Sequence, residues 1–396
     1  MKRLLSFVLF AALSMLSACG GGGGSAPSAG GSVPVVPTPV AQSNVLPMVV
    51  GAGPSNNVNI PFVSVRVCVP GTSDCRTIDN VLVDTGSTGL RLLNSTMSGL
   101  ALPAQTIPGS TVILECAQFL SFVTWGPVKL ADIYLGSNKA ATIPMQVIAD
   151  PAYAVVPAGC SSAGPLAAGV SDIHANGILG IGVFVNDGQR YYNCAPTSTQ
   201  TRCTTILTAA QQVQNPVAAL GTDNNGVVLE LPAIGATGAR EVSGSLILGV
   251  GTRENNQLGN ARVIQTDSRG YFSTTYKGVT LTNSFMDSGS NGLYFADAAL
   301  PDCPGNLTGF YCPSVTQNLS ATVRLRNGTA ETINFSVGNA SSLLASSSFA
   351  YNNLGGGLAD VTFDWGLPFY FGRRVFSVIE GRNSVAGVGP LVAYTP

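Results

Sequence analysis

The chain has 396 residues, only 10% of them charged, and a formal net charge of −1, which excludes the strongly basic composition of many nucleic-acid-binding proteins. The hydrophobic fraction is 45%, yet beyond residue 20 no apolar run is long enough to span a bilayer. Gly (47) and Pro (24) are scattered between short runs of β-branched and aromatic residues. This pattern predicts many short strands joined by turns.

The N-terminus is typical of a secretion signal. A positively charged start precedes an apolar stretch, residues 4–15, and residues 16–19 read Leu-Ser-Ala-Cys. The pattern resembles the bacterial lipoprotein signal, in which Cys19 is lipidated and becomes the first residue of the mature chain. The alternative is an ordinary cleaved signal peptide with an incidental cysteine. Gly20 stands where Asp would retain a Gram-negative lipoprotein at the inner membrane, so we expect a lipid-anchored protein of the cell envelope, at the outer membrane.

A flexible linker is expected at residues 20–56, after the signal segment 1–19. Five consecutive glycines open it, and its prolines favour an extended chain. From residue 57 the pattern becomes that of β strands. Residues 62–67 alternate apolar and polar side chains, and an apolar strand ends at Asp84. Further strands are expected at residues 112–114, 129–135, 145–148, 227–231 and 245–248, and a helix at residues 204–220.

Nine cysteines are present, and eight remain when Cys19 is set aside. An even number in an oxidising compartment predicts disulfide bonds. Three pairs would each close a short loop rich in turn residues, and the other two cysteines would form a long-range pair. The expected pairs are Cys68–Cys75, Cys194–Cys203, Cys303–Cys312 and Cys116–Cys160. Metal ligation is the weaker alternative, because no Cys-x-x-Cys occurs and a single histidine is present, so we expect neither metal nor cofactor.

One short pattern occurs twice. Residues 81–92 read VLVDTGSTGLRL and residues 284–295 read SFMDSGSNGLYF. In both copies an apolar strand runs into Asp, then Ser or Thr, Gly and Ser. Asp84 and Asp287 occupy the same position of the pattern, 203 residues apart. The repeat indicates two related lobes, which we place at residues 57–250 and 251–396.

Each copy would present a carboxylate on a tight turn, with a glycine that allows close packing and hydroxyl groups that orient the carboxylate. A single copy would be consistent with an Asx turn and nothing more. If the lobes pack with a two-fold relation, the two carboxylates meet and share one proton. One carboxyl group then acts as a base toward water, and the other acts as an acid toward a carbonyl oxygen.

These two segments, Asp-Thr-Gly-Ser at 84–87 and Asp-Ser-Gly-Ser at 287–290, resemble the catalytic motifs of the pepsin-like aspartic protease family. Three further segments are similar to family landmarks: residues 176–182 (NGILGIG) to the apolar-apolar-Gly element of the first lobe, residues 369–378 (FYFGRRVFSV) to its second-lobe partner, and residues 244–249 (GSLILG) to the strand before the lobe crossover. The resemblance extends from about residue 57 to the C-terminus.

The resemblance implies a mainly β, bilobal fold, with two pseudo-symmetric β lobes and a cleft between them. It also implies that Asp84 and Asp287 form the catalytic dyad. The residues that would support this dyad are Thr85, Gly86, Ser87, Ser288, Gly289 and Ser290.

Family members close a hairpin flap over the cleft, and this flap carries a Tyr followed by a Gly-rich tip. The matching region here, residues 116–130, contains no Tyr, and Gly126 is its only glycine. Its aromatic residues are Phe119, Phe122 and Trp125. One of them would stand over the cleft, or all three would pack in the core.

Two functions therefore compete. The first is an aspartic peptidase that hydrolyses peptide bonds through Asp84 and Asp287, with a peptide or protein substrate. The second is an inactive binding protein that holds a peptide or partner in the same cleft; a purely structural envelope protein is a third class. A triad based on His174, the single histidine, is disfavoured because no Gly-x-Ser-x-Gly motif occurs. We expect a monomer that contacts the membrane through Cys19 and binds no nucleic acid.

Overall fold

The computed structural model describes residues 42–107, 111–193, 207–358 and 361–396. The signal segment with Cys19 and the expected Cys194–Cys203 bond lie outside the described residues. None of the helices in the described part is long and apolar enough to cross a membrane.

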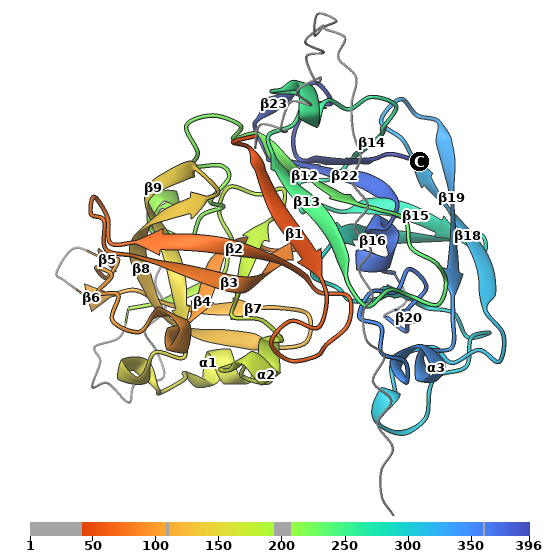
Figure 1. Cartoon of the computed structure of the whole chain (residues 1–396), viewed down its shortest axis with the longest axis horizontal. Coiled ribbons are helices and arrows are strands. Elements are labelled where there is room, and N and C mark those ends of the chain that lie inside the picture. Colours follow the sequence, from red (N-terminus) through yellow and green to blue (C-terminus); the bar gives the residue numbers. More distant parts are fainter. Residues whose placement is uncertain (1–41, 108–110, 194–206, 359–360) are drawn as a thin grey trace, which may run out of the picture. The chain divides into compact units, whose positions relative to one another are not determined.

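A 14-stranded sheet forms the first half of the body and reaches into the second (Figure 1). Its strands, in spatial order, are β11 (Arg190–Tyr192), β7 (Leu114–Gln118), β8 (Val123–Leu135), β9 (Asn138–Ile148), β4 (Thr88–Leu93), β10 (Gly177–Ile181), β3 (Cys75–Asp84), β2 (Pro61–Cys68), β1 (Val45–Val50), β13 (Val242–Leu248), β12 (Gly226–Leu231), β22 (Arg373–Val378), β25 (Leu391–Tyr394) and β14 (Arg262–Gln265). Because β8 also pairs with β2, the six strands from β8 to β2 close into a ring.

A seven-stranded sheet forms the second lobe. Its strands, in spatial order, are β19 (Ala330–Val337), β18 (Gln317–Arg324), β15 (Phe272–Tyr276), β16 (Val279–Asp287), β21 (Phe363–Gly366), β17 (Leu293–Phe295) and β20 (Gly355–Gly356). The core of this lobe is aromatic: the Phe363 ring stacks on Phe295 at 4.8 Å and on Trp365 at 4.1 Å between ring centroids.

Short elements complete the described fold. The two-stranded sheets pair β5 (Thr106–Ile107) with β6 (Thr111–Val112) and β23 (Asn383–Ser384) with β24 (Gly387–Val388). The α-helices are α1 (Ala158–Ser161), α2 (Val170–Ile173) and α3 (Ala340–Leu344). The 3-10 helices are η1 (Asn94–Met97), η2 (Pro151–Tyr153), η3 (Ala209–Gln211), η4 (Glu254–Asn256), η5 (Gly305–Leu307) and η6 (Leu367–Tyr370). The expected fold class, mainly β with two lobes, is confirmed.

The expected linker is too long at its C-terminal end. Residues 45–50 form β1, which pairs along its whole length with β13 and runs down the middle of Figure 1. Leu46, Met48 and Val50 are buried in the main core, whereas Pro47 takes an exposed position of the alternation. Sequence analysis missed this strand because it contains Pro47, a residue that is unusual within strands. The strand forms because β13 pairs with it. The sheets also do not divide at residue 250, because β14, β22 and β25 return to the first sheet.

The helix expected at residues 204–220 is wrong for the described residues from 207 onward. That stretch contains the short η3, turns and the isolated β-bridges of Gln214 and Leu220. Asn215 is fully buried, and its side-chain amide donates hydrogen bonds to the backbone carbonyls of Gly182 and Phe184, at 3.0 and 3.1 Å. The Asn215 side chain thus satisfies two backbone carbonyl groups of a neighbouring loop. Pro216 prevents a helix from continuing through this segment.

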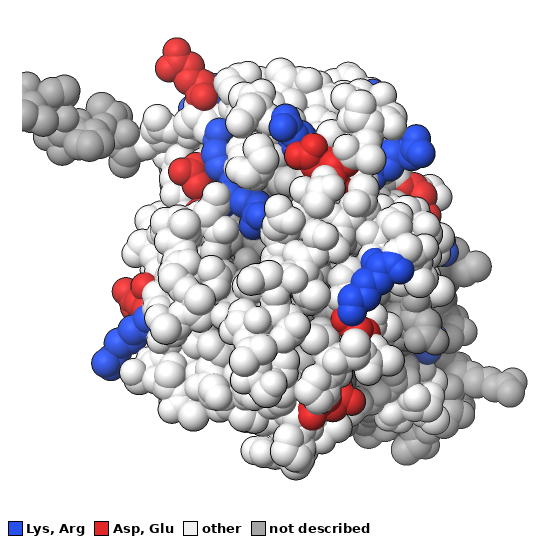
Figure 2. All heavy atoms as spheres, turned by 90° about the vertical axis from the view of Figure 1, so that its right-hand side faces the viewer, with Lys and Arg blue, Asp and Glu red and all other residues white. Residues whose placement is uncertain are grey.

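Charged side chains are sparse on the surface. On the face shown in Figure 2 they stand singly and in mixed sign, and most of that surface consists of uncharged residues.

Three of the four predicted disulfides are present: Cys68–Cys75, Cys116–Cys160 and Cys303–Cys312. The Cys116–Cys160 bond ties β7 to α1 across a separation of 44 residues, whereas the Cys68–Cys75 bond spans 7 residues. Because a disulfide restricts the unfolded chain more when it closes a longer loop, the two bonds should contribute unequally to stability.

We expect the double variant C116S/C160S to lose about 4 kcal/mol of unfolding free energy and C68S/C75S to lose about 2 kcal/mol. Denaturant unfolding of the two variants and the parent measures both values. Equal losses would contradict the loop-length argument.

Candidate active site

The two repeated aspartates lie at the ends of equivalent strands. Asp84 is the last residue of β3, and Asp287 is the last residue of β16. Each strand is held between two neighbours, so its end is fixed on both sides. The turns that follow the two strands contact each other, as the sequence repeat predicted.

A reciprocal set of hydrogen bonds joins the two turns. The Thr85 N–H donates to Ser288 Oγ (3.1 Å), and the Ser288 N–H donates to Thr85 Oγ1 (2.9 Å). Each hydroxyl then donates to a carbonyl of the opposite strand: Thr85 to Met286 (3.2 Å) and Ser288 to Val83 (2.7 Å). All four residues are buried. We expected both hydroxyl groups to orient the carboxylates, but they fix one turn to the other instead.

The second hydroxyl of each motif reaches the carboxylate. The Ser87 hydroxyl donates to Asp84 Oδ2, and the Ser290 hydroxyl donates to Asp287 Oδ2 at 2.9 Å. Turn N–H groups occupy the other carboxyl oxygen on both sides. The rotation of both carboxyl groups is therefore set before any ligand arrives.

The glycine of each motif makes room for the opposite aspartate. A Cβ atom on Gly86 would lie 2.5 Å from the carboxyl carbon of Asp287, and a Cβ on Gly289 would lie 2.8 Å from that of Asp84. Both distances are too short for any real side chain. Glycine is thus required at the two positions because the carboxyl groups approach so closely.

The two carboxyl groups influence each other electrostatically. Burial raises the pKa of Asp287 well above its usual range, and the neighbouring Asp84 carboxyl adds to this effect. Two adjacent carboxylates repel each other when both are ionised, and this repulsion favours the protonated form of Asp287. The arrangement can present a base and an acid to the same bound molecule.

An equivalent third strand supports each aspartate. In the first lobe, β10 runs parallel to β3 with Gly180 opposite Asp84, and it also pairs antiparallel with β4. In the second lobe, β21 runs parallel to β16 with Gly366 opposite Asp287, and it pairs antiparallel with β17. The second-lobe partner expected at residues 369–378 is therefore wrong, because that segment forms η6 and β22. The partner reads FDWG, and its Asp364 interrupts the apolar pattern that we used to search for it.

A hairpin flap is present beside the dyad. Strands β7 and β8 form the hairpin, and residues 119–122 form its tip. The Phe119 ring lines the cavity of the dyad, and Phe122 stacks behind it at 4.7 Å between ring centroids. Trp125 is buried in a separate cluster and donates to the Tyr153 carbonyl, so it belongs to the core. Leu120, which sequence analysis missed, is 72% exposed at the tip.

A buried ion cluster anchors the base of the flap, and the sequence analysis did not find it. The Arg91 guanidinium on β4 contacts Glu115 on β7 at 2.6 Å and Asp187 at 2.5 Å. The Tyr191 hydroxyl donates to Asp187. All four side chains are buried. The cluster connects the segment after Asp84 to the flap, and its members are far apart in sequence.

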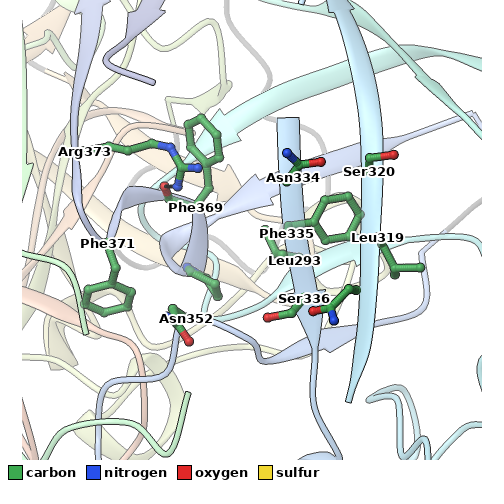
Figure 3. A pocket seen from close by; sticks show the side chains of 12 residues that line it. Leu293, Leu319, Ser320, Asn334, Phe335, Ser336, Asn352, Phe369, Phe371 and Arg373 are labelled. Atoms are coloured by element: carbon green, nitrogen blue, oxygen red, sulfur yellow. Dashed lines mark hydrogen bonds between the residues drawn. The ribbon is translucent and has the colours of Figure 1, made fainter. Parts of the chain in front are cut away.

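The dyad opens into a cavity of about 590 Å³. Apolar and polar side chains both line it. The apolar and aromatic ones include Phe119, Leu120, Val183, Phe184, Tyr271 and Phe285, and the polar ones include Gln118, Asp187, Gln189 and Arg269. A second cavity, of about 550 Å³, lies between η6 and the β18–β19 hairpin (Figure 3). Arg373 is its only charged lining residue, so it offers no pair of groups for acid–base chemistry.

His174 lies apart from the dyad cavity, at the C-terminal end of α2. Within the described ranges, no three His, Cys, Asp or Glu side chains are grouped as metal ligands.

The family model described as "Protein of unknown function (DUF3443)" matches residues 40–394, so the chain belongs to this family. No curated protein matches the sequence. Among solved structures, the chain is similar to an aspartic proteinase from Irpex lacteus at 15% identity, with a TM-score of 0.48 over 89% of this chain and 96% of that chain. At this level, the similarity adds no argument about activity.

Replacing Gly86 by Ala should separate the two carboxyl groups. The added methyl would overlap Asp287, so we expect a loss of about 1–3 kcal/mol in unfolding free energy. The pKa of Asp287 should also fall toward its usual range, because the methyl would push the Asp287 carboxyl group away from Asp84. Gly235→Ala is the matched control, since nothing lies within 4 Å of a Cβ there. Denaturant unfolding and carboxyl titration by NMR measure both effects, and equal behaviour of the two variants would refute the argument.

Replacing Thr85 by Val should remove two of the four hydrogen bonds between the turns at nearly constant volume. The change leaves the buried Ser288 N–H and Met286 carbonyl without their partner, at a cost of about 1–3 kcal/mol for each unsatisfied group. The exposed Ser64, which donates to Asp79, provides the control Ser64→Ala, with an expected change within about 0.5 kcal/mol. Chemical denaturation compares the two variants.

Proposed function

We propose that this chain is an aspartic peptidase that hydrolyses peptide bonds through Asp84 and Asp287. The observation that carries the proposal is the close contact of the two carboxyl groups, which glycine at positions 86 and 289 permits. Burial, followed by this contact, raises the pKa of Asp287, which would let the pair share one proton. A purely structural pair of aspartates would gain nothing from this repulsive arrangement.

The mechanism requires only groups that the chain itself supplies. A water molecule between the carboxyl groups gives its proton to the ionised member and attacks the peptide carbonyl carbon. The protonated member gives its proton to the carbonyl oxygen, so the tetrahedral intermediate forms without a charged oxygen. Protons then return through the pair to the leaving amine as the C–N bond breaks. Ser87 and Ser290 hold both carboxyl groups in position throughout.

The cavity suits an extended peptide with apolar side chains near the bond to be cleaved. Phe119 and Leu120 approach from the flap, and Tyr271 and Phe285 line the second-lobe side. An apolar side chain placed between them would lose contact with water, which favours binding. Cys19 would tether this body to the outer membrane, as the lipoprotein-like signal suggests.

A second candidate is a catalytically inactive surface lipoprotein that binds a peptide or partner in the same cavity. The flap favours this alternative, because its tip residues at 119–122 include no Tyr hydroxyl above the dyad. Binding alone would not depend on a shared proton.

Peptide cleavage between pH 3 and 8 distinguishes the two candidates. The expected result with the mature chain is cleavage that disappears in Asp84→Asn and in Asp287→Asn, because either change removes the shared proton. Cleavage should fall as the pH rises through the raised pKa of Asp287, since both carboxyl groups are then ionised and no acid remains.

Asp79→Asn is the matched control, because Asp79 is exposed and remote from the cavity. It should cleave like the parent. If a folded parent protein cleaves nothing at any pH but binds peptides, the binding candidate holds.

A further inference from the structure

Asp364 on β21 is a buried carboxyl group that the mechanism above does not use. Its side chain is fully buried, and neither of its oxygens has a hydrogen-bond partner within the described residues. It also forms no ion pair there, unlike Asp132, whose carboxylate contacts Lys139. An unpaired carboxylate in such a place costs much free energy, so its presence calls for a physical explanation.

The register places Asp364 directly behind the dyad. It pairs with Phe285 on β16, two residues before the position where Gly366 meets Asp287. Since alternate residues of a strand face the same side, Asp364 lies on the side of Asp287. The Ser290 hydroxyl is near enough to influence the pKa of Asp364, although the two side chains form no hydrogen bond with each other. The end of β21 also contacts the Ser290 turn, because the Leu367 N–H donates to the Ser290 carbonyl at 2.8 Å.

The Ser290 hydroxyl has only one hydrogen, and the structure directs it to Asp287. That hydrogen is therefore not available to Asp364, whose oxygens have no hydrogen-bond partner within the described residues. A proton on Asp364 would supply the hydrogen for a bond between the two groups. We propose that Asp364 is a positioning residue of the dyad, whose protonated carboxyl group donates to Ser290 and so keeps the Ser290 hydrogen aimed at Asp287.

The surroundings keep Asp364 protonated. The titratable groups that face it are Asp287 on β16, Asp84 on β3, Tyr294 on β17 and Tyr370 on η6, and none of them is a cation. Burial, followed by the charge of Asp287, raises the pKa of Asp364 well above its usual range. Its stabilising effect is present at acid pH and is lost as the pH rises through this raised pKa.

The first lobe has no such group. Ile178 of β10 occupies the equivalent place, two residues before Gly180, and packs in an apolar cluster with Leu82. Ser87 therefore donates to Asp84 without a carboxyl group behind it. The two aspartates therefore differ in their surroundings, because Asp364 lies behind Asp287 and Ile178 lies behind Asp84.

Two substitutions at position 364 separate hydrogen bonding from simple packing. Asp364→Asn keeps a donor for Ser290 but cannot ionise, whereas Asp364→Leu removes the donor. Titration of carbon-13-labelled aspartate carboxyl groups by NMR follows Asp287 in each protein. We expect the pKa of Asp287 to rise by about one unit in Asp364→Leu, because the ionised form loses a well-aimed hydrogen bond, and to stay unchanged in Asp364→Asn. An unchanged value in both variants overturns the proposal.

Ser290→Ala provides a second test, in which the direction of the change in the pKa of Asp364 decides. This test does not require Asp364→Leu to fold. If Asp364 donates to Ser290, removal of the hydroxyl lowers the pKa of Asp364. If Ser290 instead donates to an ionised Asp364, removal raises that pKa, and the proposal is wrong. Titration of Asp364 near pH 4 in the parent, as for an exposed aspartate, would refute it equally.

The effect on cleavage rests on the proposed function, whereas the titrations do not. If the parent cleaves peptides, Asp364→Leu should lower kcat about tenfold with KM unchanged, and Asp364→Asn should match the parent. If the parent cleaves nothing, the peptidase proposal fails while the NMR result still decides the role of Asp364. A parent that cleaves but shows no shift of Asp287 overturns the role of Asp364 alone.

Discussion

The exchange of hydrogen bonds between Thr85 and Ser288 is the contact on which the site depends. Each residue uses both its N–H and its hydroxyl group, so four bonds connect two turns that are 203 residues apart. All the partners are buried, and in such a place a lost bond costs more than a formed bond contributes. This exchange holds Asp84 and Asp287 together against their mutual repulsion. The positions of the two carboxyl groups are thus set by the fold itself.

The two lobes share the frame around their aspartates and differ in what surrounds it. Each frame consists of a strand ending in Asp, a parallel third strand and a glycine opposite the carboxyl group. The first lobe closes into a ring of strands, and its flap is anchored by the Cys116–Cys160 bond and the buried Arg91. The second lobe remains an open sheet with an aromatic core. The hairpin beside the two aspartates thus belongs to the first lobe alone.

Only 10% of the residues are charged, and several charged residues are buried near the site. In the Arg91 cluster one cation contacts two carboxyl groups, and burial raises the pKa of Glu115, one of the two, well above its usual range. Loss of Arg91 would leave the buried carboxyl groups without a cation. Asp364 has no cation at all and is tolerated because it can keep a proton. Both solutions place titratable groups next to the dyad, where burial strengthens every electrostatic interaction. The surface, by contrast, is mostly uncharged on the face shown in Figure 2.

Local patterns were sufficient to predict whatever depends on neighbouring residues. The mainly β class, the Cys68–Cys75 and Cys303–Cys312 disulfides and the two Asp-Ser/Thr-Gly-Ser turns all follow from short stretches of sequence, and Cys116–Cys160 was predicted because these two cysteines remained. Long-range contacts decided the rest. The strand at 45–50 forms because β13 supplies its partner, and residues 207–220 stay non-helical because Asn215 bonds to a distant loop. The place of Asp364 behind Asp287 depends on strand register, which no local pattern encodes, since an isolated Asp predicts an exposed position until its neighbours in the sheet are known.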